Sequence, residues 1–270
     1  MESSVYKVLR AVLHLEKLNN YPSWVALIGE LLGIILSVTI YYYTAMAFSP
    51  IMKGDLNFYG TDYFSYVLIG EMGLMIPAYL FANPSSRLKN FISEKKLSSL
   101  LSYPIDLHEL LTYWINAGIL LEVLRVLLHF VIAILFFKLN LDIKGFILMF
   151  LIIVISYPIF LGLGLIGAAI IMFFGRGDSI LNYITTISLF LAGAYFPTEV
   201  FPPIIQKIGH YISPFNSVLT AMRKAFNNEL FLNDFYPLII WILIAYPIGV
   251  YLLKYAQNKF FDRGSEIILK

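Results

Sequence analysis

The sequence predicts an all-α polytopic membrane protein with six transmembrane helices. Of its 270 residues, 59% are hydrophobic and only 13% are charged, whereas soluble domains are about 45–50% apolar and about 25% charged. The mean hydropathy is +0.78, and the charges gather between long apolar runs. The chain has no cysteine, which excludes disulfides, thiolate catalysis and cysteine-ligated metal.

Six apolar segments are long enough to cross the roughly 30 Å hydrocarbon core of a bilayer. We place them at residues 24–48, 63–82, 107–137, 145–174, 180–196 and 236–256. The third and fourth exceed what a straight crossing needs, so they are expected to tilt or bend. In the fourth, Pro158 predicts a bend, and three glycines predict a close-packing surface: Gly162, Gly164 and Gly167.

The distribution of basic residues indicates that both termini are cytoplasmic. In this orientation the inner segments carry twelve lysines and arginines and the outer segments six, with Arg125 inside a span. Such a bias follows the positive-inside rule. We therefore expect a multi-pass protein of the plasma membrane (cell inner membrane), N-in and C-in. The net charge of +2 is too small to indicate a nucleic-acid partner.

Residues 1–22 are predicted to form an amphipathic helix that lies on membrane lipids at the inner interface. The apolar side consists of Val5, Val8, Leu9, Val12, Leu13 and Leu15, and the basic side of Lys7, Arg10, His14 and Lys17. The alternative is a packed helix of a soluble extension, but sixteen amphipathic residues at 3–18 have no domain on which to pack.

The loop after the second span predicts a cytoplasmic helix over residues 84–104. Leu88, Phe91 and Ile92 form one apolar patch, and a second patch of Leu97, Leu100 and Leu101 is rotated by about half a turn. The charged residues Glu94, Lys95 and Lys96 separate the two patches. A helix that is apolar on two sides needs two partners, its own bundle and a cytosolic protein. A solvated charged loop would not need these apolar residues.

Between the fifth and sixth spans, residues 197–226 predict two short helices on the outer side, at 203–213 and 217–226. Pro203 suits the first turn of a helix, and Pro214 ends it. The apolar face from Ile204 to Ile212 gives the first helix a surface to bury. We expect both helices to dip into the outer leaflet or to cap the bundle without crossing, the alternative being an ordinary surface loop.

Five ionisable residues fall within spans, where such groups are functional candidates by default: Glu30, Glu71, Glu122, Arg125 and His129. One interpretation pairs Glu122 with Arg125 inside their own helix. Glu122, Arg125 and His129 share one face of the third span, since they stand at i, i+3 and i+7. Other interpretations place this face against a substrate or bond it to Glu71. A proton relay could use the same groups, as in an ion-coupled secondary transporter, although we find no internal repeat of the kind many such transporters show.

Tyr41, Tyr42 and Tyr43 stand at the outer end of the first span. They form either an aromatic belt at the interface or a candidate substrate path. Enzyme motifs such as HExxH and GxSxG are absent, and the four histidines are too scattered in sequence to predict a metal site. No GxxxxGK[ST] motif occurs either, so the chain cannot hydrolyse ATP itself.

Together these features resemble the ABC-2-type membrane domains of ABC exporters, and the resemblance covers the whole chain, 1–270, as a single domain. ISEKKLSSLLSYPIDLHELL at 92–111 is similar to the family's coupling segment, and GAYFPTEVFPPIIQKIGHYISPFNSVLTAMRKAF at 193–226 to its outer signature. The N-terminal helix matches the family's interfacial elbow. Polysaccharide-exporting relatives usually carry an Arg-Asp pair after the fourth span, where this chain reads Gly175-Arg176-Gly177-Asp178.

The resemblance implies a permease subunit of an ATP-driven ABC exporter that works with a second copy or paralogue. It binds no cofactor itself, since ATP and Mg²⁺ belong to separate ABC ATPase subunits, which would push the helix at 84–104. The outer helices would form a gate, with Phe196, Pro197, Pro202, Pro203, Ile208 and Pro214. The expected substrate is hydrophobic or amphipathic, such as a drug-like molecule or lipid; a polysaccharide or glycolipid permease and an ion-coupled secondary transporter are the alternatives.

Overall fold

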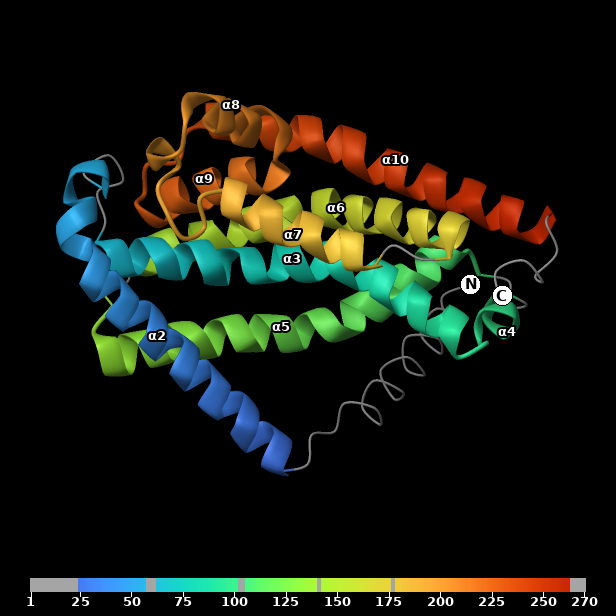
Figure 1. The fold of residues 1–270 in the computed structure, drawn as a ribbon, viewed down its shortest axis with the longest axis horizontal. Coiled ribbons are helices and arrows are strands. Elements are labelled where there is room, and N and C mark those ends of the chain that lie inside the picture. Colours follow the sequence, from blue (N-terminus) through green and yellow to red (C-terminus); the bar gives the residue numbers. More distant parts are fainter. Residues whose placement is uncertain (1–23, 57–61, 102–104, 140–141, 176–177, 263–270) are drawn as a thin grey trace.

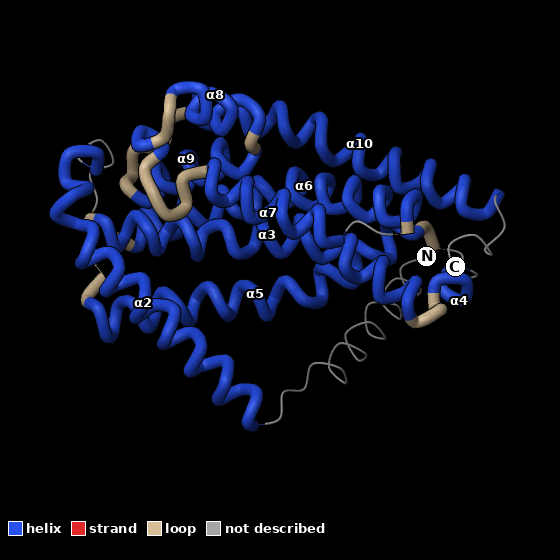
Figure 2. The backbone as a smooth tube through the Cα atoms, in the orientation of Figure 1, coloured by secondary structure: helices blue, strands red, loops and turns tan. Residues whose placement is uncertain are grey.

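The computed structural model describes residues 24–56, 62–101, 105–139, 142–175 and 178–262 (Figure 1). Throughout these ranges the regular elements are helices, and no strand occurs in them (Figure 2), which confirms the predicted all-α class. The longer helices are α2 (Trp24–Leu56), α3 (Tyr63–Ser93), α5 (Leu107–Phe137), α6 (Ile143–Phe174) and α10 (Phe235–Asp262). The interfacial helix predicted over 1–22 lies outside the described residues.

Short helices complete the fold. They are α4 (Leu97–Leu101), α7 (Asp178–Leu191), α8 (Pro203–Ile212) and α9 (Pro214–Phe226), with 3-10 turns at Thr198–Val200 and Leu232–Asp234. In Figure 1, α8 and α9 lie at one end of the long helices, whereas α4 and the last turns of α10 lie at the opposite end. The predicted inner and outer segments are therefore at opposite ends of the bundle.

Five of the described helices are long and apolar enough to cross a membrane: α2, α3, α5, α6 and α10. The fifth predicted span, 180–196, corresponds to α7, which has only 14 residues and is about 21 Å long at 1.5 Å per residue. Among the described residues the structure thus confirms five of the six predicted spans, and a sixth crossing at 180–196 stays a prediction. The helix ends early because Gly193, at φ +75°, turns the chain in a conformation that disfavours other residues.

The bundle is built around α3. In its most apolar stretch 78% of the residues are buried, compared with 44% in α6 and 17% in α2. Figure 1 shows α2 as a tilted arm beside α5, diverging from it toward the N-terminal end of α2. Movement of α3 would therefore disturb most of the bundle, whereas α2 is attached along one face only.

Small residues bring α6 and α10 into backbone contact. A Cβ added to Gly162 would lie 2.5 Å from the backbone of Ala245, and one added to Gly249 would lie 2.2 Å from the carbonyl oxygen of Gly162. Lipid-embedded helices gain little hydrophobic energy from association, so such close approach is a main source of their affinity. Gly162 thus lies on the close-packing surface that the sequence predicts for this segment.

Aspartates begin two of the long helices. Asp62 accepts a hydrogen bond from the Ser65 amide, and Asp142 accepts one from the Gly145 amide, each at 3.2 Å, so both act as N-caps. Asp142 also accepts from Nδ2 of Asn228 at 2.6 Å, which joins the start of α6 to the end of α9. This bond and the Gly145 amide lower the pKa of the Asp142 carboxyl.

Candidate functional site

A row of polar contacts runs along one face of α2. Glu30, Ser37 and Tyr41 stand at positions i, i+7 and i+11 and therefore share that face. Each one reaches a polar side chain of α5 or α3. We call these three levels of contact the polar ladder. They help to attach α2 to the bundle together with buried apolar residues such as Val38, whereas much of the remaining surface of α2 carries exposed apolar side chains such as Trp24 and Leu36.

The first level of the ladder contains three charges. The Arg125 guanidinium of α5 donates through Nε to Glu30 of α2 and through Nη1 to Glu122 one turn away. The side chains of Arg125 and Glu30 are 40% and 37% exposed. The Glu122–Arg125 pair is one of the arrangements considered from the sequence. No contact of Arg125 with Glu71 is present among the described residues. The second carboxylate that pairs with Arg125 is that of Glu30.

The second level joins His129 of α5 to Ser37 of α2. His129 is buried, with Nδ1 at 2.8 Å from the Arg125 carbonyl oxygen and Nε2 at 3.2 Å from the Ser37 hydroxyl. A carbonyl only accepts, so Nδ1 carries a hydrogen; the Ser37 hydroxyl itself donates to the Ile34 carbonyl at 2.9 Å. Both ring nitrogens of His129 therefore have a hydrogen-bonding partner.

The third level holds the Glu71 carboxylate of α3. It accepts from the Tyr41 hydroxyl at 3.1 Å and from the hydroxyl of Tyr195, which follows α7. The neighbouring tyrosines point elsewhere: Tyr42 packs on Phe64 and Phe137 of the bundle, whereas Tyr43 is 62% exposed. Of the three tyrosines in the candidate substrate path, Tyr41 is thus the one that bonds an intramembrane carboxylate.

At the cytoplasmic end predicted from the sequence, α3 runs through Pro84 without interruption to Ser93. The chain then turns, because Lys95 adopts a left-handed φ of 55° and the Lys96 amide donates back to the Phe91 carbonyl at 2.9 Å, as at many helix ends. The helix expected over 84–104 is therefore the last part of α3, a turn, and the five residues of α4.

The leucines of this region face the protein. Leu88, Phe91 and Leu97 are buried, and Ile92, Leu100 and Leu101 are partly buried against the same core. The prediction of an apolar face turned to the cytosol therefore does not fit the structure. Glu94, Lys95 and Lys96, by contrast, are exposed, and we call these three residues the charged turn. It rests on buried residues before and after it.

At the other end, the predicted gate residues divide into two groups. Pro197 and Pro214 are buried and Phe196 is half-buried, whereas Pro202, Pro203 and Ile208 are exposed. The isoleucine face of α8 points away from the bundle, with Ile204 and Ile212 exposed. The opposite side packs inward, because a Cβ on Gly209 would lie 2.8 Å from the Leu191 carbonyl oxygen. The isoleucines therefore face away from the described bundle.

Arg223 of α9 is a central residue of this end that the sequence did not reveal as a site. It is buried, and its Nη2 donates to the carbonyl oxygen of Gly193 at 2.8 Å, with those of Ala194 and Tyr66 at 3.4 Å. Its Cζ lies 3.5 Å from the centre of the Tyr66 ring. A signal existed: Arg223 follows Leu219 by four residues, which places it on the apolar side of α9.

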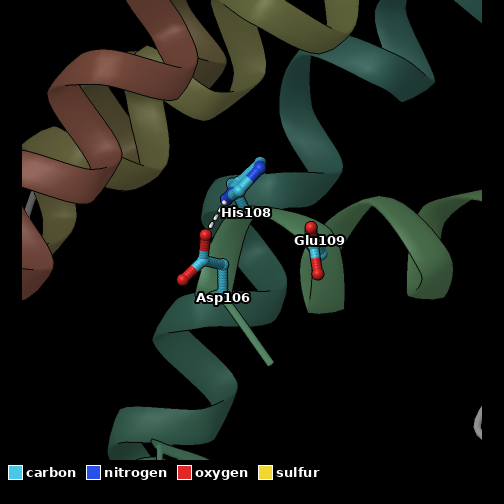
Figure 3. Close-up of side chains that lie close together, drawn as sticks. All are labelled: Asp106, His108 and Glu109. Carbon is cyan, nitrogen blue, oxygen red and sulfur yellow. Dashed lines mark ion pairs between the residues drawn. The ribbon is translucent and has the colours of Figure 1, made fainter. Parts of the chain in front are cut away.

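A cluster of ionisable side chains lies where α5 begins. Asp106, His108 and Glu109 have ligand-type atoms within 4.8 Å of one another, and in Figure 3 Asp106 and His108 face each other. Lys254 of α10 donates to Asp106 at 2.8 Å, and this bond lowers the pKa of that carboxyl. The lysine would repel a metal ion, so the arrangement suits a link between α5 and α10 rather than a metal site.

These observations define a multi-pass membrane protein with charged side chains inside its bundle and distinct structures at the two ends. The chain belongs to the ABC-2 type transporter family. The model of that family matches residues 19–227, more than half of the sequence, and this range contains the polar ladder, the charged turn and Arg223. Members are membrane components of transport systems that normally work with ABC ATPases. A comparison with curated proteins returned no significant match.

Proposed function

We propose that the chain is the permease subunit of an ATP-driven exporter and that a separate ABC ATPase acts on the charged turn. The observation that carries this proposal is the exposure of Glu94, Lys95 and Lys96 at the end of α3, the most buried long helix. A protein that docks on this turn pushes on the centre of the bundle. Both termini would lie on the same cytoplasmic side, in the plasma membrane.

A second copy or a paralogue would cover the face formed by α2 and α5. Arg125 and Glu30 are each more than one-third exposed on that face, and charged groups in a membrane span need a protein partner or a water-filled cavity. Apolar side chains surround them, including Leu121 and Leu124. A path between two copies would thus combine carboxylates with leucines, which suits a hydrophobic or amphipathic substrate such as a drug-like molecule or lipid.

Co-purification tests the proposal. The tagged chain, solubilised from its native host, is expected to retain a protein that carries a Walker A motif and hydrolyses ATP. The same preparation from a variant with Glu94→Lys, Lys95→Glu and Lys96→Glu is expected to lose this ATPase, although the chain stays folded. Purification of a stable, folded chain that never binds an ABC ATPase, even when both are co-expressed, would contradict it.

A further inference from the structure

The turn that follows α7 is fastened to α3 at four points. The Tyr63 hydroxyl donates to the Tyr195 carbonyl at 2.9 Å, and the Tyr66 hydroxyl donates to the Gly193 carbonyl at 3.0 Å. Gly70 lies so close to this turn that a Cβ on it would be 2.2 Å from the Ala194 oxygen. Glu71 adds the bond from the Tyr195 side chain. The root of the outer helices therefore rests directly on α3.

Arg223 brings α9 into the same contact. Its guanidinium bonds the carbonyls of Gly193 and Ala194 and lies over the Tyr66 ring. One side chain therefore joins α9, the turn after α7 and α3. Because it is buried among these groups, it cannot follow one of them away from the others without leaving its carbonyl partners unsatisfied. We call Arg223, Tyr66 and the turn at 193–195 the arginine clamp.

Helix α3, which carries Tyr66 near its start, reaches the charged turn at its other end. From Tyr66 to Ser93, α3 is continuous and covers about 40 Å at 1.5 Å per residue. It remains packed along this length despite Pro77 and Pro84; a Cβ on Gly164 of α6, for example, would lie 2.5 Å from the Leu80 carbonyl oxygen. A displacement imposed at the charged turn would thereby reach the clamp.

We propose that Arg223 is a positioning residue for transport, which makes α9 and the end of α7 move with α3 as one body. This inference rests on the proposed function, because it takes the ATPase to act at the charged turn. The outer helices then respond to ATP through the backbone contacts of α3, and no contact between Arg223 and the substrate is required. Loss of the clamp should uncouple ATP hydrolysis on the cytoplasmic side from movement of the outer helices.

The absence of native cysteine allows a direct test with one reporter. Thr220, exposed on α9, is changed to cysteine and labelled with bimane in the complex of the chain and its ATPase, reconstituted in lipid. ATP with vanadate is expected to change the bimane fluorescence. Arg223→Gln should reduce this change at least five-fold while ATP hydrolysis per assembled complex stays within two-fold. Lys224→Gln, which removes the adjacent lysine bonded to Asp234, should leave both values unchanged.

A cross-link supplies the second measurement. A Cβ on Gly73 of α3 would lie 3.0 Å from Sδ of Met222 on α9, so these two positions are in contact, and Gly73→Cys with Met222→Cys is the pair chosen for a cross-link beside the clamp, its formation being checked by mass spectrometry. In the Arg223→Gln background the reporter is attached first, and oxidation is expected to restore its response; in the presence of Arg223 the cross-link should not diminish it. If Arg223→Gln does not assemble, Tyr66→Phe, which removes one hydroxyl, replaces it in the same assay.

The outcomes separate the two proposals. A full fluorescence response in Arg223→Gln, or in Tyr66→Phe where that variant is needed, would overturn the role of the clamp and leave the ATP-driven function intact. A cross-link that abolishes the response in the presence of Arg223 would also overturn it, since α9 would then have to leave α3. If ATP changes nothing in the otherwise unaltered complex, the proposed function fails together with the inference.

Discussion

Arg125 of α5 and Glu30 of α2 form an ion pair that joins two membrane-length helices across 95 positions of sequence. Glu122 shares the same guanidinium from within α5. Since α2 otherwise exposes most of its apolar surface, this pair is one of the few polar contacts that fix its position. Charges at this depth are costly without a partner, so each member depends on the others.

A double-mutant cycle measures that dependence. Glu30→Gln and Arg125→Gln are expected to show a coupling energy of about 1 kcal/mol in the free energy of unfolding in detergent. The value is below that of a fully buried pair because both side chains are partly exposed and screened. Strictly additive effects of the two changes would show that the pair does not hold α2.

Tyr41 and Glu71 provide the second prediction. Tyr41→Phe removes a hydrogen bond to a carboxylate and should lower the free energy of unfolding by about 1–2 kcal/mol. Tyr43→Phe is the matched control, because that side chain is 62% exposed and should change stability by less than about 0.5 kcal/mol. Equal effects of the two changes, measured by thermal unfolding, would place Glu71 outside the polar ladder.

The charged turn and the leucine beside it should separate binding from folding. Leu97 is 4% exposed, so Leu97→Ala is expected to cost about 2–4 kcal/mol of stability. Lys96→Ala should leave stability within about 0.5 kcal/mol yet weaken ATPase binding in a pull-down of purified proteins. Normal ATPase binding by a variant with all three charges of the turn removed would argue against docking at this position.

The glycine contact between α6 and α10 gives a test of packing. Gly162→Ala introduces a Cβ at 2.5 Å from the backbone of Ala245, and such overpacking costs about 1–3 kcal/mol. At Gly33 of α2 a Cβ meets nothing within 4 Å, so Gly33→Ala should be neutral or slightly stabilising. A Gly162→Ala variant as stable as Gly33→Ala in denaturant titration would show that the helices do not touch there.

Asp106 and Lys254 predict a pH dependence. The Lys254 bond lowers the pKa of Asp106 in the folded protein, so its stabilising effect is present above the ordinary carboxyl pKa of about 4 and is lost as the pH falls through the lowered value. The stability difference between the unmodified chain and Asp106→Asn should therefore be constant from pH 7 to about pH 4 and shrink below it. A difference that grows on acidification would contradict the assignment.

The sequence predicts a segment well where its own length and apolarity determine its structure, and poorly where contacts with distant residues do. Length and apolarity define α5 completely, and the structure has it at the predicted residues 107–137, because a long apolar run between polar loops has few alternatives. The same criterion fails for α7: residues 192–196 are apolar enough for a span, but Gly193 and its bonds to α3 turn them. Tertiary contacts overrode composition there.

The site was less accessible from the sequence for a related reason. Leu97 and Leu101 fit a surface helix equally well until the turn at Lys95 folds them back onto the bundle. The burial of Arg223 cannot be predicted from its own segment, because it depends on carbonyls contributed by residues 29 and 30 positions earlier. Helical periodicity identifies a side that is apolar, but not the partner that lies on it.

One flux measurement tests the central claim, that this permease has no motor of its own and is driven at the charged turn. The purified chain is placed in liposomes loaded with an amphiphilic fluorescent dye, with and without its ABC ATPase. We predict dye movement only when the ATPase and hydrolysable ATP are both present, and its loss when Glu94, Lys95 and Lys96 are reversed in charge. Movement by the chain alone on a proton or sodium gradient would contradict the claim.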